Sequence, residues 1–246
     1  MGIRVRQTVE AACHFLDSAS FEFKSLWREC DKLQKVDAVN ASLMKASLAG
    51  LAGDLEGLER WLTNAEQNGG GESVRGTRFA MYSDLGFVTE ASKSYRETIA
   101  NDDSLARLNL THGIACGSFS EMLQAADRWA KEDTKLEEQD VLRRSAQARD
   151  ALRALGVPEE NVRSMMDRAG ELMRARRLLW ANLMPDLIAS STPAAHPFFA
   201  LNYRVDVEPA EAAEMTWALA ERLAEDDLIF PFVTVAFVSK QRPAAS

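Results

Sequence analysis

Apolar residues recur along most of the chain at alternating steps of three and four positions. In the first stretch they are Val9, Ala12, Leu16, Ala19, Phe23, Leu26, Cys30 and Leu33. This spacing places them on one face of an α-helix that packs lengthwise against its neighbours. We therefore predict a single helix of about 25 residues here, roughly 37 Å long.

The same periodicity returns in four further stretches, which span residues 44–65, 81–99, 105–129 and 162–183. The pattern passes through Gly50 and Gly53 without a change of phase. No proline precedes Pro158, so long helices are permitted before it. The sequence thus predicts a mainly α protein, with a bundle of about five long antiparallel helices over residues 1–190.

Leu51 to Glu66 resembles the turn and second helix of a tetratricopeptide repeat. Gly53, Gly86 and Gly117 recur at intervals of 33 and 31 residues, near the period of that family. The resemblance implies a helical-repeat binding module in which the chain turns at each glycine. The continuous apolar phase favours long helices instead, and helices of about 30 residues give the same interval without a repeat.

The periodicity changes from helical to strand-like after Pro197. Phe199, Leu201, Tyr203 and Val205 alternate with other residues, which is typical of a strand with one buried face. A helix that begins at Pro209 and a second strand over 229–239 follow. A connection of about 20 residues favours parallel pairing of the two strands. Residues 197–246 are therefore predicted to form a small β-α-β unit.

Two strands alone do not make a stable sheet, so their edges need a further strand, a second copy or a partner. We therefore predict that residues 197–246 are an assembly or docking unit. The aromatic residues that we expect to bind a partner are Phe199, Tyr203, Phe230, Phe232 and Phe237.

The composition narrows the range of functions. The 246 residues carry a formal net charge of −8, which disfavours a dedicated nucleic-acid binder. Cys13, Cys30 and Cys116 form no CxxC pair, which is typical of a reducing compartment. No apolar run approaches the length of a membrane span. We predict a cytoplasmic protein without a metal or a cofactor.

Arginine is concentrated in residues 143–177, which hold nine arginines, no lysine and five acidic residues. Arg174, Arg176 and Arg177 are predicted to contact a partner, because guanidinium groups bind carboxylates and phosphates. The alternative is pairing within the chain. Residues 206–227 hold eight acidic residues and one arginine, so a contact between the two regions is a further hypothesis.

Arg107 and His112 offer a possible catalytic pair. They resemble the motif of the HEPN ribonucleases, helical bundles whose dimers carry an arginine followed four to six residues later by a histidine. The resemblance implies RNA cleavage, but here Leu108 stands where the family usually has a polar residue. A histidine held within the helical bundle is the other interpretation of His112.

These patterns predict a non-enzymatic scaffold or adaptor, which acts as a homo-oligomer or docks one protein partner. A HEPN-like ribonuclease, or an inactive relative, is the alternative, and RNA is a partner only under that hypothesis. A tetratricopeptide-like binding module is the third possibility.

Overall fold

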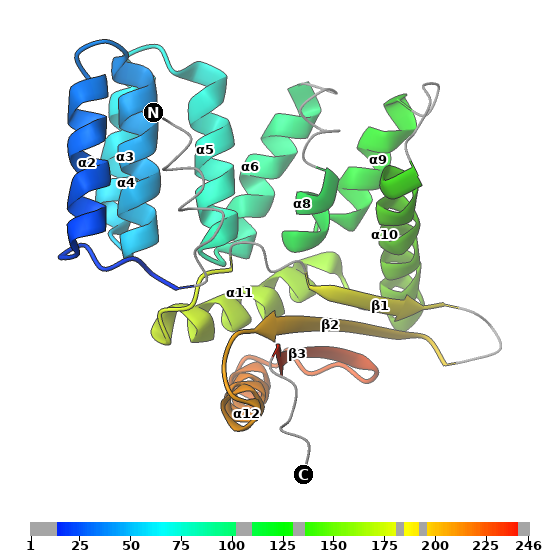
Figure 1. Cartoon of the computed structure of the whole chain (residues 1–246). Coiled ribbons are helices and arrows are strands. Elements are labelled where there is room, and N and C mark those ends of the chain that lie inside the picture. Colours follow the sequence, from blue (N-terminus) through cyan, green and yellow to red (C-terminus); the bar gives the residue numbers. More distant parts are fainter. Residues whose placement is uncertain (1–13, 102–109, 130–135, 181–184, 192–195, 241–246) are drawn as a thin grey trace. The chain divides into compact units, whose positions relative to one another are not determined.

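The computed structural model confirms a mainly helical chain with a small sheet near the C-terminus (Figure 1). The described residues contain ten helices and three strands. No helix among them is long and apolar enough to cross a membrane. The residues that the structure describes are 14–101, 110–129, 136–180, 185–191 and 196–240.

The chain forms two compact units. The first comprises residues 1–86 and 173–182, and the second comprises residues 87–172 and 183–246. The predicted boundary between residues 1–190 and 197–246 therefore falls inside the second unit. The helices of the first unit are α2 (Phe21–Leu33), α3 (Ala38–Ala52), α4 (Leu55–Gln67) and α5 (Gly71–Asp84).

Two helices that the apolar pattern predicts as continuous are not continuous over the described residues. The first was predicted to run from Val9 to Leu33, but α2 begins at Phe21 and residues 14–20 are not helical. Ser20 begins this helix, because its Oγ accepts a hydrogen bond from the Phe23 N–H group at 3.1 Å.

The second interruption separates α3 from α4 at Gly53. This glycine has a left-handed backbone with φ of +84°, and its N–H donates to the Gly50 carbonyl. The Asp54 N–H donates to the Ala49 carbonyl, which completes a Schellman motif. Asp54 then caps the start of α4 by accepting a hydrogen bond from Gly57 N–H.

Gly86, Gly117 and Gly156 end helices in the same way. Their φ angles are +69°, +60° and +68°, in the region that residues with a Cβ rarely adopt. The count of five long helices is therefore not confirmed.

The described helices of the second unit are α6 (Val88–Asn101), α8 (Leu110–Ala115), α9 (Phe119–Trp129), α10 (Leu136–Leu155), α11 (Glu159–Ala175) and α12 (Pro209–Glu225). The last residues of α11, from Met173 on, belong to the first unit.

Lys45 is a buried residue of α3 whose side chain contacts residues of α2 and α4. Its Nζ contacts Asp31 at 2.7 Å and the Gln34 side chain at 2.6 Å. The same atom lies 4.2 Å from the ring centroid of Trp61 and 5.8 Å from that of Trp27. This buried cation thus joins the three helices through cation–π and polar contacts.

In the second unit, α11 carries charged residues at steps of four that cap other helices. Glu159 accepts hydrogen bonds from the N–H and hydroxyl of Ser120, at the start of α9. Arg163 donates to the Gly117 carbonyl at 3.1 Å, at the end of α8. Asp167 accepts from the N–H and hydroxyl of Thr89, at the start of α6. Acids thus lie at helix starts and a cation at a helix end, as the helix dipole favours.

The second unit also contains a three-stranded sheet in the order β1-β2-β3. Its strands are β1 (Asp186–Ser190), β2 (Phe198–Val205) and β3 (Val233–Ser239). The β2 and β3 strands pair in parallel, as predicted, and are joined through α12. The sequence prediction missed β1, which pairs antiparallel with the other side of β2 and supplies a strand from within the chain.

The free edge of β3 is partly covered by α12. The Thr216 Oγ1 accepts a hydrogen bond from Phe237 N–H at 2.9 Å and donates one to the Phe237 carbonyl at 3.1 Å. One helical side chain therefore replaces a neighbouring strand at this position. The prediction of an assembly unit rested on unpaired strand edges. That argument is weaker now, because β1 pairs with β2 and Thr216 binds the outer edge of β3.

Candidate functional site

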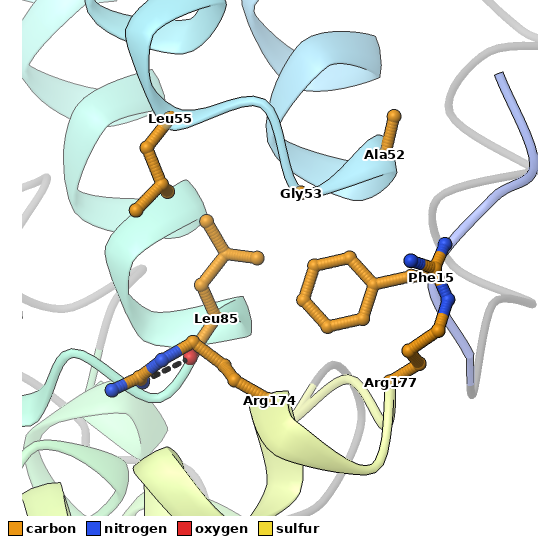
Figure 2. A pocket seen from close by; sticks show the side chains of 7 residues that line it. All are labelled: Phe15, Ala52, Gly53, Leu55, Leu85, Arg174 and Arg177. Atoms are coloured by element: carbon orange, nitrogen blue, oxygen red, sulfur yellow. Dashed lines mark hydrogen bonds between the residues drawn. The ribbon is translucent and has the colours of Figure 1, made fainter.

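A pocket of about 220 Å³ lies in the first unit, beside the turn between α3 and α4 (Figure 2). The segment before α2, the ends of α3, α4 and α5, and the C-terminal end of α11 with the residues after it all contribute to its walls. The lining residues are Phe15, Ala52, Gly53, Leu55, Leu85, Arg174 and Arg177.

Backbone hydrogen bonds hold Phe15 in this pocket from both sides. Its N–H donates to the Arg177 carbonyl at 2.9 Å, and the next N–H, of Leu16, donates to the Leu51 carbonyl at 2.8 Å. His14 forms an isolated bridge with Leu178. The sequence prediction missed Phe15, because it placed this residue within a helix but outside the apolar face of that helix.

Gly53 makes room for the Phe15 ring. A Cβ atom at position 53 would lie only 3.2 Å from Cδ1 of Phe15, closer than an ordinary carbon contact. The same glycine needs its left-handed backbone to turn the chain. The turn between α3 and α4 is therefore also part of the pocket wall.

Arg174 supports the pocket by binding the end of α5. Its Nη1 donates to the carbonyls of Leu85 at 2.7 Å and Gly86 at 2.9 Å. A cation at a helix C-terminus is favoured by the helix dipole. Figure 2 shows the Arg174 guanidinium directed toward Leu85 and away from Phe15. The role of this side chain is thus to hold Leu85 in place.

Arg177 is the exposed cation of the pocket. Its guanidinium carbon lies 5.6 Å from the ring centroid of Phe15, within cation–π range. Among the residues that the structure describes, it has no ion-pair partner. Because no carboxylate of the described residues pairs with it, its guanidinium can bind an anion from outside the chain. The backbone of Arg177 has a φ of +56°, which is unusual for a residue with a long side chain.

Arg176, the third arginine predicted to contact a partner, does not line this pocket. It is half-buried, and its N–H donates to the Met173 carbonyl at 3.0 Å. The structure thus brings Arg174 and Arg177 to one pocket and leaves Arg176 beside it.

The pocket combines apolar side chains with two arginines. Its seven lining residues include no serine, cysteine, histidine or carboxylate that could act as a nucleophile or general base. Apolar walls beside a guanidinium group suit an anionic group attached to an apolar body.

The two described cysteines, Cys30 and Cys116, are buried free thiols. Burial raises the pKa of Cys30 to about 11 and that of Cys116 to about 12, so both thiols stay protonated near neutral pH. In the described ranges, no three histidine, cysteine or carboxylate side chains gather in a way that could hold a metal ion.

Of the predicted pair Arg107 and His112, the structure describes His112 alone. Arg107 lies outside the described residues, whereas His112 belongs to α8. Desolvation lowers the pKa of His112, so its imidazole is neutral at pH 7. RNA cleavage by this pair stays a prediction.

Three of the five predicted partner-binding aromatics lie in the core. Phe199, Tyr203 and Phe237 are buried, and the Phe199 ring packs edge-on against Phe119 with centroids 5.9 Å apart. A partner cannot reach these side chains without unfolding the unit, so we withdraw them as contact residues. Their alternation predicted burial correctly, but the burial is within the chain.

Phe230 and Phe232 remain accessible. Phe230 is half-buried, and Phe232 exposes 59% of its surface at the turn that precedes β3. The Val233 N–H donates to the Phe230 carbonyl across Pro231, and Phe232 has a φ of +64°. That turn position normally favours glycine, so an exposed phenylalanine is held there against its backbone preference.

Pairing within the chain uses part of the arginine-rich region. Arg168 contacts Asp226 at 2.5 Å, and Arg222 contacts Glu171 at 3.3 Å. Residues 143–177 and 206–227 are therefore in contact, as hypothesised. These pairs are half-exposed, so each contributes less than about 1 kcal/mol to stability.

Comparison with family models, curated proteins and solved structures finds no match to this chain.

Proposed function

We propose that this protein is a non-enzymatic adaptor, built from paired helices, that binds a protein partner through the pocket of the first unit. The observation that carries the proposal is Arg177, a cation beside the Phe15 ring that has no ion-pair partner within the described part of the chain. Charged groups left unpaired on an apolar rim are typical of interfaces that select a partner by charge.

The helix turns support the same proposal. Glycine ends a helix at Gly53, Gly86 and Gly117, at the intervals that resemble a tetratricopeptide repeat. Repeats of paired helices expose extended surfaces that bind other polypeptides. The adaptor and repeat-module hypotheses from the sequence thereby become one proposal.

The contact residues in this proposal are Phe15, Leu55 and Arg177, with Arg174 as a positioning residue. Phe230 and Phe232 form a second candidate surface, in the other unit. Self-association is the alternative mode of binding. The proposed location is the cytoplasm, for which the cysteine usage is one argument.

Photo-crosslinking in the native host tests this proposal. A photo-reactive amino acid is placed at Leu55, which is 41% exposed on the pocket rim, and separately at Arg75, an exposed position of α5 outside the pocket. We expect one discrete protein adduct from position 55 and none of that mass from position 75. Native mass measurement of the gently purified chain should show a stoichiometric companion or a stable oligomer.

A lone monomer without an adduct at position 55 contradicts the proposal. Co-purifying RNA that the protein cleaves also contradicts it, and would favour the ribonuclease hypothesis. Position 75 controls for adducts that any exposed helix forms.

A further inference from the structure

The size of the pocket limits what it can enclose. Pockets that enclose a whole drug-sized ligand have volumes of about 300–1,000 Å³, whereas this one has about 220 Å³. It therefore has room for one terminal group or one side chain, and the rest of a larger ligand must lie outside it.

The walls demand two properties from that group. Phe15, Leu55 and Leu85 present apolar surface, which favours an aliphatic or aromatic group. Arg177 presents a guanidinium with parallel N–H donors, which match the two oxygens of a carboxylate. The single exposed guanidinium balances one negative charge, which fits a carboxylate better than a doubly charged phosphate.

The C-terminal residue of a polypeptide combines these properties on one carbon atom. Its free carboxylate and its side chain both leave the same Cα, whereas the side chains of Asp and Glu carry no apolar group beyond the charge. The preceding residues of such a chain would leave the small pocket and cross the neighbouring helices, which adds contacts that a free small acid lacks.

We propose that the pocket binds the free C-terminal carboxylate of a partner polypeptide that ends in an apolar residue. The carboxylate pairs with Arg177, and the terminal side chain packs against Phe15, Leu55 and Leu85. This inference rests on the proposed function, because it specifies which part of a protein partner the adaptor binds.

A matched set of small probes tests this chemistry on the full-length chain. N-acetyl-leucine has both features, N-acetyl-leucinamide lacks the charge, and N-acetylglycine lacks the apolar group. Binding is followed by the NMR shifts of the backbone amides of Gly53, Leu55 and Leu85. We expect saturable shifts with N-acetyl-leucine and at least about tenfold weaker binding of the other two, given the strength of a charged hydrogen bond.

Two variants test the guanidinium. Arg177→Gln should weaken N-acetyl-leucine binding about tenfold or more, whereas Arg177→Lys should retain part of it, because a lysine keeps the charge but not the paired donors. Arg60→Gln is the matched control: Arg60 is also exposed and lies over an aromatic ring, 6.0 Å from the centroid of Trp61, but does not line the pocket. It should bind as the wild type does.

A tetrapeptide that ends in leucine identifies the source of the carboxylate. The inference expects this peptide to bind at least about threefold more tightly than N-acetyl-leucine, and its C-terminal amide to lose that affinity. Equal affinity of the peptide and N-acetyl-leucine would overturn the assignment to a polypeptide and favour a small carboxylic acid. Equal binding of acid and amide, or equal weakening by Arg60→Gln, would overturn the carboxylate site itself.

These outcomes separate the inference from the proposed function. A crosslinked partner at Leu55 that Arg177→Gln leaves unchanged overturns the inference while the adaptor function stands. Tight peptide binding without a crosslinked companion in the host contradicts the proposed function instead.

Discussion

The two units use buried charge differently. In the second unit, Arg163 is surrounded by acceptors: the Gly117 carbonyl lies at 3.1 Å, Glu121 at 3.9 Å and Glu159 at 4.0 Å. In the first unit, Lys45 lies against two tryptophan rings, and its one acidic partner, Asp31, is half-exposed. Arg163 thus lies among polar acceptors alone, whereas Lys45 combines one close ion pair with contacts to two aromatic rings.

Two arginines, one from each unit, also differ in their partners. Arg168 in the second unit is paired with Asp226 and Glu171. Arg177 in the first unit contacts only the Phe15 ring through its guanidinium, as far as the described residues reach. Charges that are already paired stabilise their own fold, whereas an unpaired cation beside a pocket is available to a ligand. This difference is why we place the candidate site in the first unit.

The largest expected effect comes from replacing each buried cation with methionine. Arg163→Met should lower the free energy of unfolding by about 3 kcal/mol, because Glu121 and Glu159 lose their buried cation. Lys45→Met should cost less than about 1 kcal/mol, because water can solvate Asp31 and the methionine sulfur packs against the tryptophan rings. Denaturant unfolding of both variants measures the two changes. Equal losses would contradict the distinction between the units.

A second comparison concerns two aspartates in different surroundings. Asp84 ends α5 in the first unit, where burial raises the pKa of its carboxyl to about 7. Because the folded state then holds the proton more tightly than the unfolded state, stability falls as the pH rises from about 4 to 7. Asp84→Asn should therefore raise the free energy of unfolding by about 2 kcal/mol at pH 8, and by much less near pH 4.

Asp167 in the second unit serves as the opposite case. It accepts hydrogen bonds from Thr89 at the start of α6, so Asp167→Asn should lower the free energy of unfolding by about 1 kcal/mol. Thermal unfolding of both variants at pH 5 and pH 8 measures whether each substitution stabilises or destabilises the protein. A stabilising Asp167→Asn, or a destabilising Asp84→Asn at pH 8, would show that their surroundings are misassigned.

The smallest expected effect concerns Phe232, which shares a left-handed backbone with Arg177. Phe232→Gly should raise the free energy of unfolding by about 0.5 kcal/mol, because glycine adopts this conformation without strain. Ile229→Gly is the control, since Ile229 is exposed but does not have a positive φ, and it should destabilise slightly. A loss of stability in Phe232→Gly would mean that the ring stabilises the fold, and would remove it from the second candidate surface.

The apolar periodicity predicted which residues are buried more reliably than it predicted where the chain turns between helices. The seam from Met44 to Ala65 lies in α3 and α4, but it continues in phase through the turn at Gly53. Helical periodicity records which residues face a core, and two helices joined by a short turn share one core. The informative signal was a glycine followed by an N-cap residue, as in Gly53-Asp54 and Gly117-Ser118.

The sequence alone determined local structure in this protein. The alternation at Phe199, Leu201 and Tyr203 predicted β2, and Pro209 marked the start of α12, because local backbone preference and burial pattern act over a few residues. Arg174 and Arg177 were candidate contact residues because arginine is concentrated in residues 143–177. Only the tertiary structure placed Phe15 beside Arg177 and paired β1 with β2, since contacts between distant residues depend on how the whole chain packs.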